Sequence, residues 1–383
     1  MLFFPDPTTR SVGLDLSDHV FRLIEIERGP FYHRSLQLRR YAEERLPDGL
    51  VVRGEFKRPD EVVVHLKNLI KKAYGHHIGH GAVVSLPETR TFIKVITVTM
   101  PEKADDLGKA VLMEAELHIP TALSDLYVDW QVQGDVKKIA PGRTVTVTIG
   151  AAPKIIVDAY SQALEAAGIV PVAFEIEAQA IVRSVINTRN PETTGQAIGI
   201  IDFGATRSSF IVYDHDTIQF TVSIPQSGDE ATRLIASALD VSLEEAERTK
   251  RQCGVDAHMC GNELWKTMHP FLQSMTDRIL DAVSFYRDHF AGGRMLDQLV
   301  ISGGGANMNR IDELLSELTK VSVIKADPWI NIDPDRCPLP REIILSSTTA
   351  VGLALRHVFE GAAKPKAPKK DRRKDKAALA SKI

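Results

Sequence analysis

Blocks of apolar residues separated by polar turns run along the chain, and their spacing predicts alternating strands and helices. Residues 12–27, VGLDLSDHVFRLIEIE, are apolar-rich and interrupted after Asp15, which predicts a strand, a tight turn and a second strand. The segment after Pro101 spaces its apolar residues as a helix does, and Pro120 ends it. Further strands are expected at 82–86, 92–99, 126–133, 143–151, 170–176, 218–225, 298–302 and 321–326, and further helices at 154–168, 177–188, 242–254, 264–290 and 346–358. Strand-rich blocks that alternate with helices are typical of layered α/β folds.

The second half of the chain opens in the same way as the first half. Residues 199–213, GIIDFGATRSSFIVY, place Asp202 at the end of an apolar strand, followed by small residues and a second strand. Asp15 and Asp202 lie 187 residues apart, about half the length of the chain. This repeat predicts two related halves, each with an acid-bearing hairpin.

The turn after Asp202 has the residue types that bind phosphate. In Gly204-Ala205-Thr206 a glycine lets backbone N–H groups approach phosphate oxygens without obstruction by a side chain. The neighbouring Asp202 would repel phosphate unless Mg²⁺ lay between them. Two such hairpins facing each other across a cleft would suit a nucleoside triphosphate with its magnesium ion.

A third segment also has residue types that are suited to binding phosphate. Ser302 is expected to end a strand, and Gly303, Gly304 and Gly305 to form a turn without Cβ atoms. A helix is expected to start at Asn307, with an electropositive N-terminus that favours phosphate. The segment is neither a Walker loop nor a GxGxxG fingerprint, so the folds that carry those motifs are not supported.

Composition narrows the class of protein. A chain of 383 residues is long enough for two lobes, and no apolar stretch reaches the roughly 18 residues of a membrane span. The three cysteines are few and odd in number, which favours reduced thiols in a cytoplasm. From Lys364 onward nine Lys or Arg stand against two Asp, which predicts a disordered basic tail at 361–383. The net charge of −3 for the whole chain therefore leaves the remainder at −10, which argues against nucleic-acid binding.

The order of these segments resembles the actin-like ATPase superfamily of actin, Hsp70 and the sugar kinases. The Asp15 turn resembles its first phosphate motif, 202–206 its second phosphate motif and 302–307 its adenosine motif. Within the superfamily the chain is most similar, over about residues 10–360, to the PilM family of type IV pilus assembly proteins, relatives of the cell-division protein FtsA. The stretches that carry this likeness are FIKVITVTMP, EAELHIP, YVDWQV, AAPKIIVDAYSQALEAAGI, FEIEAQA and SIPQSGDEATRLIASALDVSLEEAE.

The resemblance implies an actin-like (ribonuclease H-like) α/β fold of two lobes with a small inserted α/β subdomain. The expected division is 10–85 for part of the first lobe, 86–168 for the insert, 169–198 and 338–360 for the return to the first lobe, and 199–337 for the second lobe. Actin and the kinases carry different material in place of this insert.

The resemblance also implies site residues. Asp15 and Asp202 would hold a hydrated Mg²⁺, and Glu177 or Gln179 would lie near the attacking water. Glu247, Lys250 and Arg251 resemble residues that flank the adenosine, although a solvated helix face is almost as compatible with them. The residues expected to bind ATP are Asp15, Ser17, Asp202, Gly204, Ala205, Thr206, Glu247, Lys250, Arg251, Gly303, Gly304, Gly305 and Asn307.

The first phosphate motif departs from the family pattern. PilM proteins usually carry a glycine and a run of hydroxyl residues after the first Asp, whereas this chain has Ser17 in place of the glycine, followed by Asp18-His19-Val20. A carboxylate beside a terminal phosphate weakens its attraction, and a lost glycine restricts the approach of the backbone. The resemblance therefore implies ATP binding with weak or absent hydrolysis, because hydrolysis depends most on placement.

The leading hypothesis is a cytoplasmic ATP-binding assembly protein of a type IV pilus or a related type II secretion machine. The resemblance implies that it receives the cytoplasmic N-terminal segment of a PilN-like inner-membrane protein in a groove beside the insert, and reaches the membrane only through this partner. Other pilus components and a second copy of the chain are further candidate partners. The alternative is an FtsA-like protein that polymerises at the membrane, for which the tail offers little apolar area. A small-molecule kinase is a third hypothesis, without a recognisable substrate-pocket motif.

Overall fold

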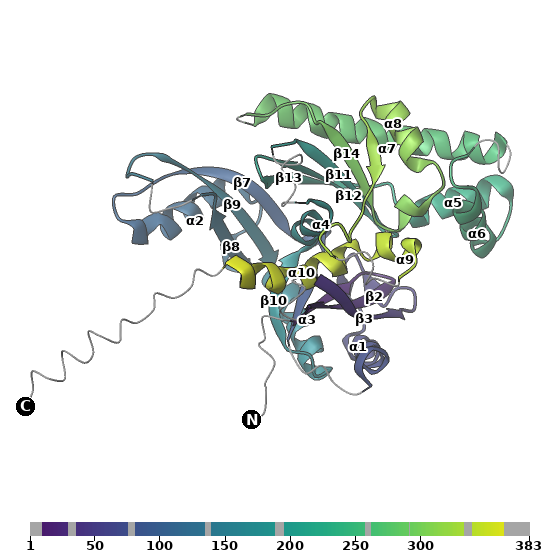
Figure 1. Ribbon diagram of the computed structural model, residues 1–383, viewed down its shortest axis with the longest axis horizontal. Coiled ribbons are helices and arrows are strands. Elements are labelled where there is room, and N and C mark those ends of the chain that lie inside the picture. Colours follow the sequence, from purple (N-terminus) through teal and green to yellow (C-terminus); the bar gives the residue numbers. More distant parts are fainter. Residues whose placement is uncertain are drawn as a thin grey trace, which may run out of the picture.

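The computed structural model describes residues 10–29, 36–75, 81–134, 139–187, 195–256, 262–290, 292–332 and 339–363 (Figure 1). Its strands form a five-stranded sheet, an eight-stranded sheet and a two-stranded ribbon of β4 (Val51–Val52) and β5 (Glu55–Phe56). No helix in these ranges is both long and apolar enough to cross a membrane. The basic tail from Lys364 onward lies outside the described residues.

The first sheet is covered by helices on both faces. Its order is β10–β6–β1–β2–β3, in which β1–β2–β3 is an antiparallel meander and β1, β6 and β10 run parallel. Separate apolar clusters join one face to α1 and α3 and the other face to α4 and α10. The elements are β1 (Arg10–Leu16), β2 (Val20–Arg28), β3 (Leu36–Arg45), β6 (Ala82–Leu86), β10 (Pro171–Ile176), α1 (Pro59–Tyr74), α3 (Lys154–Ala166), α4 (Glu177–Val185) and α10 (Thr348–Ala363).

The second sheet contains the same plan. Its β15–β14–β11–β12–β13 part joins an antiparallel meander, β11–β12–β13, to the parallel strands β14 and β15. The strand order matches that of the first sheet strand for strand, so the expected duplication is present in the topology. The elements are β11 (Ile198–Phe203), β12 (Ser208–Asp214), β13 (Thr217–Ile224), β14 (Gln298–Ser302), β15 (Val323–Lys325), α5 (Gly228–Leu239), α6 (Leu243–Cys253), α7 (Asn262–His289), α8 (Ile311–Thr319) and α9 (Arg341–Ser346).

Helix α4 packs between the two halves. Its Ala178 and Ile181 belong to the core of the second sheet, whereas Ala180 packs with Val83 and Leu353 against the first sheet. The side chains of Ala178, Ala180 and Ile181 are all fully buried. The helix therefore holds its first residue, Glu177, at the boundary between the halves.

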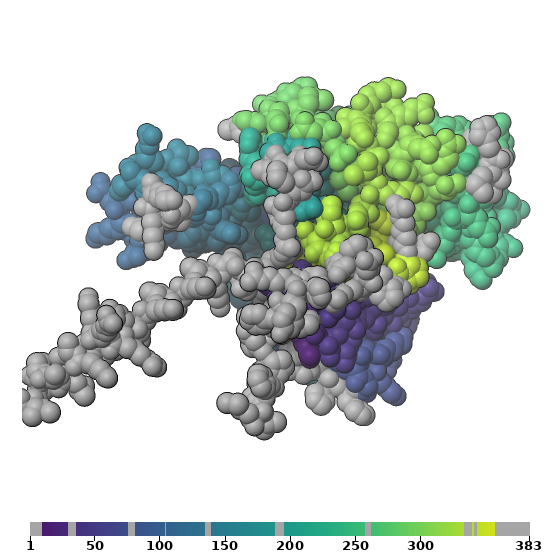
Figure 2. All heavy atoms as spheres, viewed as in Figure 1, coloured from purple at the N-terminus to yellow at the C-terminus, as the bar shows by residue number. Residues whose placement is uncertain are grey.

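A small α/β module extends from the second sheet to one side of the molecule (Figures 1 and 2). It consists of β7 (Phe92–Thr99), α2 (Leu107–His118), β8 (Leu126–Val132) and β9 (Thr144–Pro153), and it has its own apolar core. Strand β7 pairs with β9 over its whole length but with β13 only at Lys94 and Phe220. Helix α3, which the sequence places in the insert, packs instead in the core of the first sheet.

Two local expectations are wrong. The helix after the glycines begins at Ile311 and not at Asn307, because Gly304–Asn307 form a single 3₁₀ turn and Arg310 takes a left-handed φ of 59°. The intervening backbone is used in packing, since the carbonyl of Asn309 accepts from Val255 N at 3.0 Å. Cys253 is disulfide-bonded and not a reduced thiol. The spacing of the cysteines alone did not reveal this bond.

Candidate functional site

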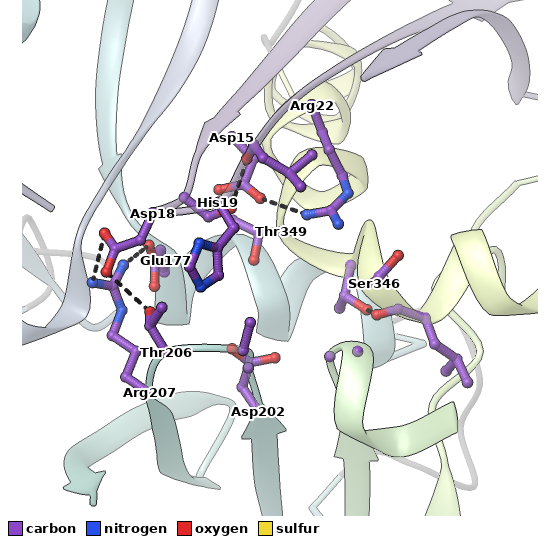
Figure 3. Close-up of a pocket in the computed structure, with 18 residues that line it drawn as sticks. Asp15, Asp18, His19, Arg22, Glu177, Asp202, Thr206, Arg207, Ser346 and Thr349 are labelled. Atoms are coloured by element: carbon purple, nitrogen blue, oxygen red, sulfur yellow. Dashed lines mark hydrogen bonds and ion pairs between the residues drawn. The ribbon is translucent and has the colours of Figure 1, made fainter. Parts of the chain in front are cut away.

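The acid-bearing turns of the two sheets face each other across a cleft (Figure 3). Asp15 is the last residue but one of β1, and Asp202 is the last but one of β11. Because the two strands hold equivalent places in sheets of the same order, both acids reach the same cleft. Its lining residues are Asp15, Ser17, Asp18, His19, Val20, Arg22, Glu177, Asp202, Gly204, Ala205, Thr206, Arg207, Gly303, Gly304, Leu345, Ser346, Thr348 and Thr349.

Most of the predicted site residues lie in this cleft, and some do not. The predicted residues that line it are Asp15, Ser17, Glu177, Asp202, Gly204, Ala205, Thr206, Gly303 and Gly304. The predicted residues that do not line it are Gln179, Glu247, Lys250, Arg251, Gly305 and Asn307. The roles assigned to the second group remain predictions.

The two acids lie in an environment that disfavours their charge. Ser85 Oγ donates to Asp15 at 3.1 Å, and Ser302 Oγ donates to Asp202 at 3.1 Å. Burial, reinforced by Glu177, raises the pKa of Asp15 to about 7 and the pKa of Asp202 to about 6. Three neighbouring carboxyl groups in one cleft would be stabilised by a cation.

A metal ion would depend on water for most of its ligands here. Within the described ranges no group of three or more His, Cys, Asp or Glu side chains has an arrangement that could hold a metal ion. Two acids from opposite turns are compatible with Mg²⁺, which keeps several of its waters when it binds to proteins. The donor set therefore fits a hydrated magnesium ion and not a fully protein-bound metal.

The glycines of the cleft leave room for a ligand or for close backbone packing. A Cβ on Gly204 would lie 2.5 Å from the Arg207 carbonyl oxygen, so the second turn can be this tight only with glycine. Gly303 has a φ of 83°, and its Cβ would lie 2.8 Å from Asp202 Oδ1. A Cβ on Gly304 would meet nothing within 4 Å, so Gly304 leaves open space. Gly305 is a packing glycine, since its Cβ would clash with the Phe203 ring at 2.4 Å.

The first turn uses its polar side chains internally. Ser17 Oγ donates to the Val20 carbonyl at 2.6 Å, which closes the β1–β2 turn. The Asp18 carboxylate accepts from the backbone N–H groups of Arg53 and Gly54 at 3.0 and 2.9 Å. The Ser17 hydroxyl and the Asp18 carboxylate therefore both contribute to the local fold.

Arg207 of the second half lies between Asp18 of the first half and Glu177 at the boundary between the halves. Its Nη2 donates to Glu177 Oε1 at 3.0 Å, and its Nη1 lies 3.9 Å from Asp18 Oδ1. These charges raise the pKa of Arg207 above its ordinary value against the opposing effect of burial, so the guanidinium stays charged. Thr206 Oγ1 also donates to Asp18, at 3.0 Å.

His19 makes a second contact between the halves. Its Nε2 lies 2.7 Å from Asp229 Oδ2 at the start of α5. The hydrogen bond to Asp229 raises the pKa of His19, which favours the imidazolium form. The adjacent residues Asp18 and His19 thus both contact the second half.

Sequence reasoning missed several lining residues. Arg207 directly follows the motif 202–206, and its charge next to a phosphate-type turn was the available signal. Thr348 and Thr349 begin α10, and a pair of hydroxyl residues at a predicted helix start was a second signal. The position of Arg22, 3.9 Å from Asp15, depends on the register of β1 and β2 and had no local signal.

The residues expected near the adenosine form a network between α5 and α6. Lys250 Nζ donates to the Gly228 carbonyl at 2.9 Å and to Thr232 Oγ1 at 2.8 Å, and pairs with Glu247 at 2.6 Å. Arg251 also contacts Glu247, at 2.8 Å. Lys250 is buried, which argues against a fully solvated helix face for this residue. The network fixes α6 beside the end of the Gly204 turn, because Gly228 N donates to the Gly204 carbonyl at 3.0 Å.

A second concave surface lies where the module meets the second sheet. We call it the aromatic groove, and its lining residues are Glu88, Thr89, Thr91, Phe92, Ile93, Lys94, Phe220, Thr221, Ser223, Phe285 and Phe290. Phe220 packs against Phe285 and Phe290 with ring centroids 5.7 and 5.1 Å away. Burial raises the pKa of Glu88 to about 7, and its Oε2 has no hydrogen-bond partner. The groove therefore combines aromatic rings with polar side chains, among them the buried carboxyl group of Glu88.

Comparisons with known proteins agree with the architecture. The model of a family described as type IV pilus assembly protein PilM matches residues 13–358. A solved structure described as a PilM-PilN type IV pilus biogenesis complex has a TM-score of 0.79 at 24% identity, covering 92% of this chain and 99% of that chain. The ethanolamine utilization protein EutJ from Carboxydothermus hydrogenoformans has a TM-score of 0.55 at 15% identity, covering 92% of this chain and 90% of that chain. MreB5 of Spiroplasma citri bound to ADP has a TM-score of 0.54 at 14% identity, covering 93% and 97%. These likenesses confirm the expected actin-like α/β fold.

Proposed function

Because the chain belongs to the PilM family of type IV pilus assembly proteins, we propose that it is a nucleotide-binding assembly protein that recruits a PilN-like membrane protein. It acts on the cytoplasmic side of the inner membrane and reaches the membrane through this partner. The observation that carries the nucleotide part is the convergence of the Asp15 turn, the Gly204–Thr206 turn and Gly303–Gly304 on one cleft.

The ligand of the cleft is an adenine nucleotide with its magnesium ion. The backbone of Gly204–Thr206 and the open space beside Gly304 are suited to phosphate groups, and MreB5 of Spiroplasma citri, which shares the fold, is described as bound to ADP. Asp15 and Asp202 would hold the magnesium through water, and the ion would neutralise charge between these acids and the phosphates. Glu247, Lys250 and Arg251 lie on α6, and we assign them to the adenosine end.

Hydrolysis of the nucleotide is slow or absent. Glu177 is the residue we assign to the attacking water, and its Oε1 already accepts from Arg207 at 3.0 Å. A carboxylate engaged in an ion pair is a weaker acceptor for a water proton. Gln179 does not line the cleft, which leaves Glu177 as the stronger of the two candidates.

The partner is the N-terminal cytoplasmic segment of a PilN-like protein, and we assign it to the aromatic groove. A structural relative of this chain is described as a PilM-PilN complex. Beyond Lys94 the β13-facing edge of β7 pairs with no strand of the described part of the chain, so an extended peptide could add along it. The rings of Phe220, Phe285 and Phe290 would receive its apolar side chains.

Two measurements test the proposal. Calorimetry with ATP and Mg²⁺ should detect binding, and no binding at millimolar concentration would contradict the nucleotide part. A synthetic peptide of the PilN-like N-terminal segment should bind in fluorescence anisotropy, and Phe285→Asp should weaken it about tenfold or more because a charge replaces one of the three rings assigned to the peptide's apolar side chains. Ile155→Asp is the matched control, since Ile155 is exposed on α3 and does not line the groove. Equal binding by both variants would exclude the groove, and no peptide binding at all would exclude the partner.

A further inference from the structure

A carboxylate of the chain itself engages groups that could otherwise bind phosphate oxygens. Asp18 is 5% exposed, and its Oδ2 accepts from Thr206 Oγ1 at 3.0 Å across the cleft. Two backbone N–H groups, those of Arg53 and Gly54, hold this carboxylate in place at 3.0 and 2.9 Å. The acid is therefore fixed beside the second turn and cannot leave it by a simple rotation.

Next to Asp18, Arg207 has one N–H group without a hydrogen-bond acceptor. Its Nη2 is engaged by Glu177, whereas its Nη1 is buried and makes no hydrogen bond, since Asp18 Oδ1 at 3.9 Å is too distant. A buried guanidinium N–H without an acceptor is costly, and the oxygen of an anion is its strongest partner. Figure 3 shows Arg207 and Thr206 on the side of the cleft opposite Asp15, with Asp18 and Glu177 close to the guanidinium.

We propose that Arg207 binds the terminal phosphate of a nucleoside triphosphate, and that Asp18 and Glu177 are built-in competitors for it. The inference rests on the proposed binding of a nucleotide in this cleft. A terminal phosphate oxygen would take Thr206 Oγ1 and Arg207 Nη1 as donors and displace their contacts with Asp18. The fixed carboxylate remains near the phosphate and repels it, so Asp18 lowers the affinity for a triphosphate more than the affinity for a diphosphate.

The exchange also changes how the two halves are joined. Asp18 belongs to the β1–β2 turn, and Thr206 and Arg207 belong to the β11–β12 turn. Without nucleotide, the chain's own carboxylate connects the turns. With a triphosphate, the ligand makes that connection, so the state of the terminal phosphate becomes linked to the contact between the halves.

The test is calorimetry on the full-length protein with Mg²⁺ and either ADP or AMPPNP, a triphosphate that resists hydrolysis. Asp18→Asn should raise the affinity for AMPPNP about tenfold and change that for ADP far less. Arg207→Ala should lower the affinity for AMPPNP about tenfold or more, and Arg207→Lys should restore part of it because the charge returns without the planar fork. In the Arg207→Ala background, Asp18→Asn should keep the part of its effect that comes from direct repulsion of the phosphate and lose the part that comes from competition for Arg207.

Asp229→Asn is the matched control. It removes another carboxylate contact between the halves, the one with His19, and does not touch Arg207. It should change the affinities for ADP and AMPPNP by the same factor. The melting temperature of each variant reports whether it folds, and if Asp18→Asn does not fold, the Arg207→Ala and Arg207→Lys pair decides the question.

The outcomes separate this inference from the proposed function. An unchanged ratio of AMPPNP to ADP affinity in the folded Asp18 and Arg207 variants overturns the inference and leaves nucleotide binding intact. If the wild-type protein and all variants bind neither nucleotide, the inference and the nucleotide part of the proposed function both fail.

Discussion

The β1–β2 turn and the β11–β12 turn hold equivalent places in two sheets of the same strand order, yet they use their polar groups differently. In the first turn Ser17 donates to the Val20 carbonyl, and Asp18 accepts from the backbone of Arg53 and Gly54 and from Thr206. In the second turn Gly204 has no side chain, and Arg207 retains a buried donor without an acceptor. Ser17 and Asp18 of the first turn are therefore engaged within the protein, whereas the second turn keeps one donor, Arg207 Nη1, for an anion.

This difference shows that a duplicated scaffold does not require duplicated chemistry. Strand order places an acid at the same point of each half, because the acid belongs to the strand. The residues after the acid decide whether backbone and side-chain donors remain available to a ligand. A change confined to those residues can alter one half of a two-part site while the fold of both halves is kept.

The largest loss of stability is expected from a variant that disrupts the β11–β12 turn. Gly204→Ala would place a Cβ 2.5 Å from the Arg207 carbonyl oxygen, so the turn would have to open, at a cost of about 2–3 kcal/mol. In the first turn, Ser17→Ala loses one hydrogen bond, worth about 1 kcal/mol. Urea denaturation of both variants measures the difference. Equal losses would show that the two turns do not differ in the way we describe.

The pH dependence of stability tests the shared acids. Their pKa values, raised by burial to about 7 for Asp15 and about 6 for Asp202, mean that the folded protein binds these protons more tightly than the unfolded chain. Their contribution is therefore complete below about pH 4 and is lost as the pH rises toward 7, and between about pH 5 and 7 the loss should reach about 2 kcal/mol for Asp15 and about 1 kcal/mol for Asp202. Chemical denaturation without nucleotide across this range measures it.

The matched variant carries Asp15→Asn and Asp202→Asn together. The amides do not titrate, so its stability should fall less over the same range than that of the wild type. All other titrating groups, His19 included, are common to both proteins and cancel in the difference. Parallel curves for the two proteins would show that the acids do not titrate in the folded state at these pH values.

Asp15 and Asp202 should contribute equally to binding of the magnesium–nucleotide complex, even though the turns that follow them differ. Asp15→Asn and Asp202→Asn, made singly, should each lower the affinity for the magnesium–nucleotide complex about tenfold, because each removes a charge that faces the ion. Calorimetry with and without Mg²⁺ measures the effect, which should vanish when EDTA replaces the metal. An unchanged affinity in either variant would mean that this acid does not hold the metal.

The smallest loss of stability is expected from the contact between His19 and Asp229, which joins the two halves. His19→Gln removes the ionic part of the contact with Asp229, and because both side chains are about one-third exposed, the loss should be only about 0.5 kcal/mol. The hydrogen bond to Asp229 raises the pKa of His19, so the contribution is present at low pH and lost as the pH rises through that pKa. Thermal melts at pH 5.5 and about pH 8.5 check this, since wild type and variant should differ only at the lower pH. A difference that persists at high pH would indicate a packing role.

Much of the site could be predicted because its signals are local. The acids at strand ends, the glycine after Asp202 and the glycine run at 303–305 are readable from apolar runs and their interruptions. The start of α8 could not be read in this way, because packing of Asn309 against Val255 delays the helix to Ile311. The pairing of Arg207 with Glu177 joins residues 30 positions apart, and no periodicity reports such a contact.

The sequence by itself determined the strands, the repeat of the two halves and the identity of the acids, because these follow from short-range alternation and composition. Only the tertiary structure decided which donors are free. Asp18 accepts both from the backbone of Gly54 and from Thr206, because sheet order and helix α4 between the halves bring these segments together. Hydrogen-bond satisfaction is a property of the folded surroundings, and so the same residue types serve the fold in one turn and remain available for a ligand in the other.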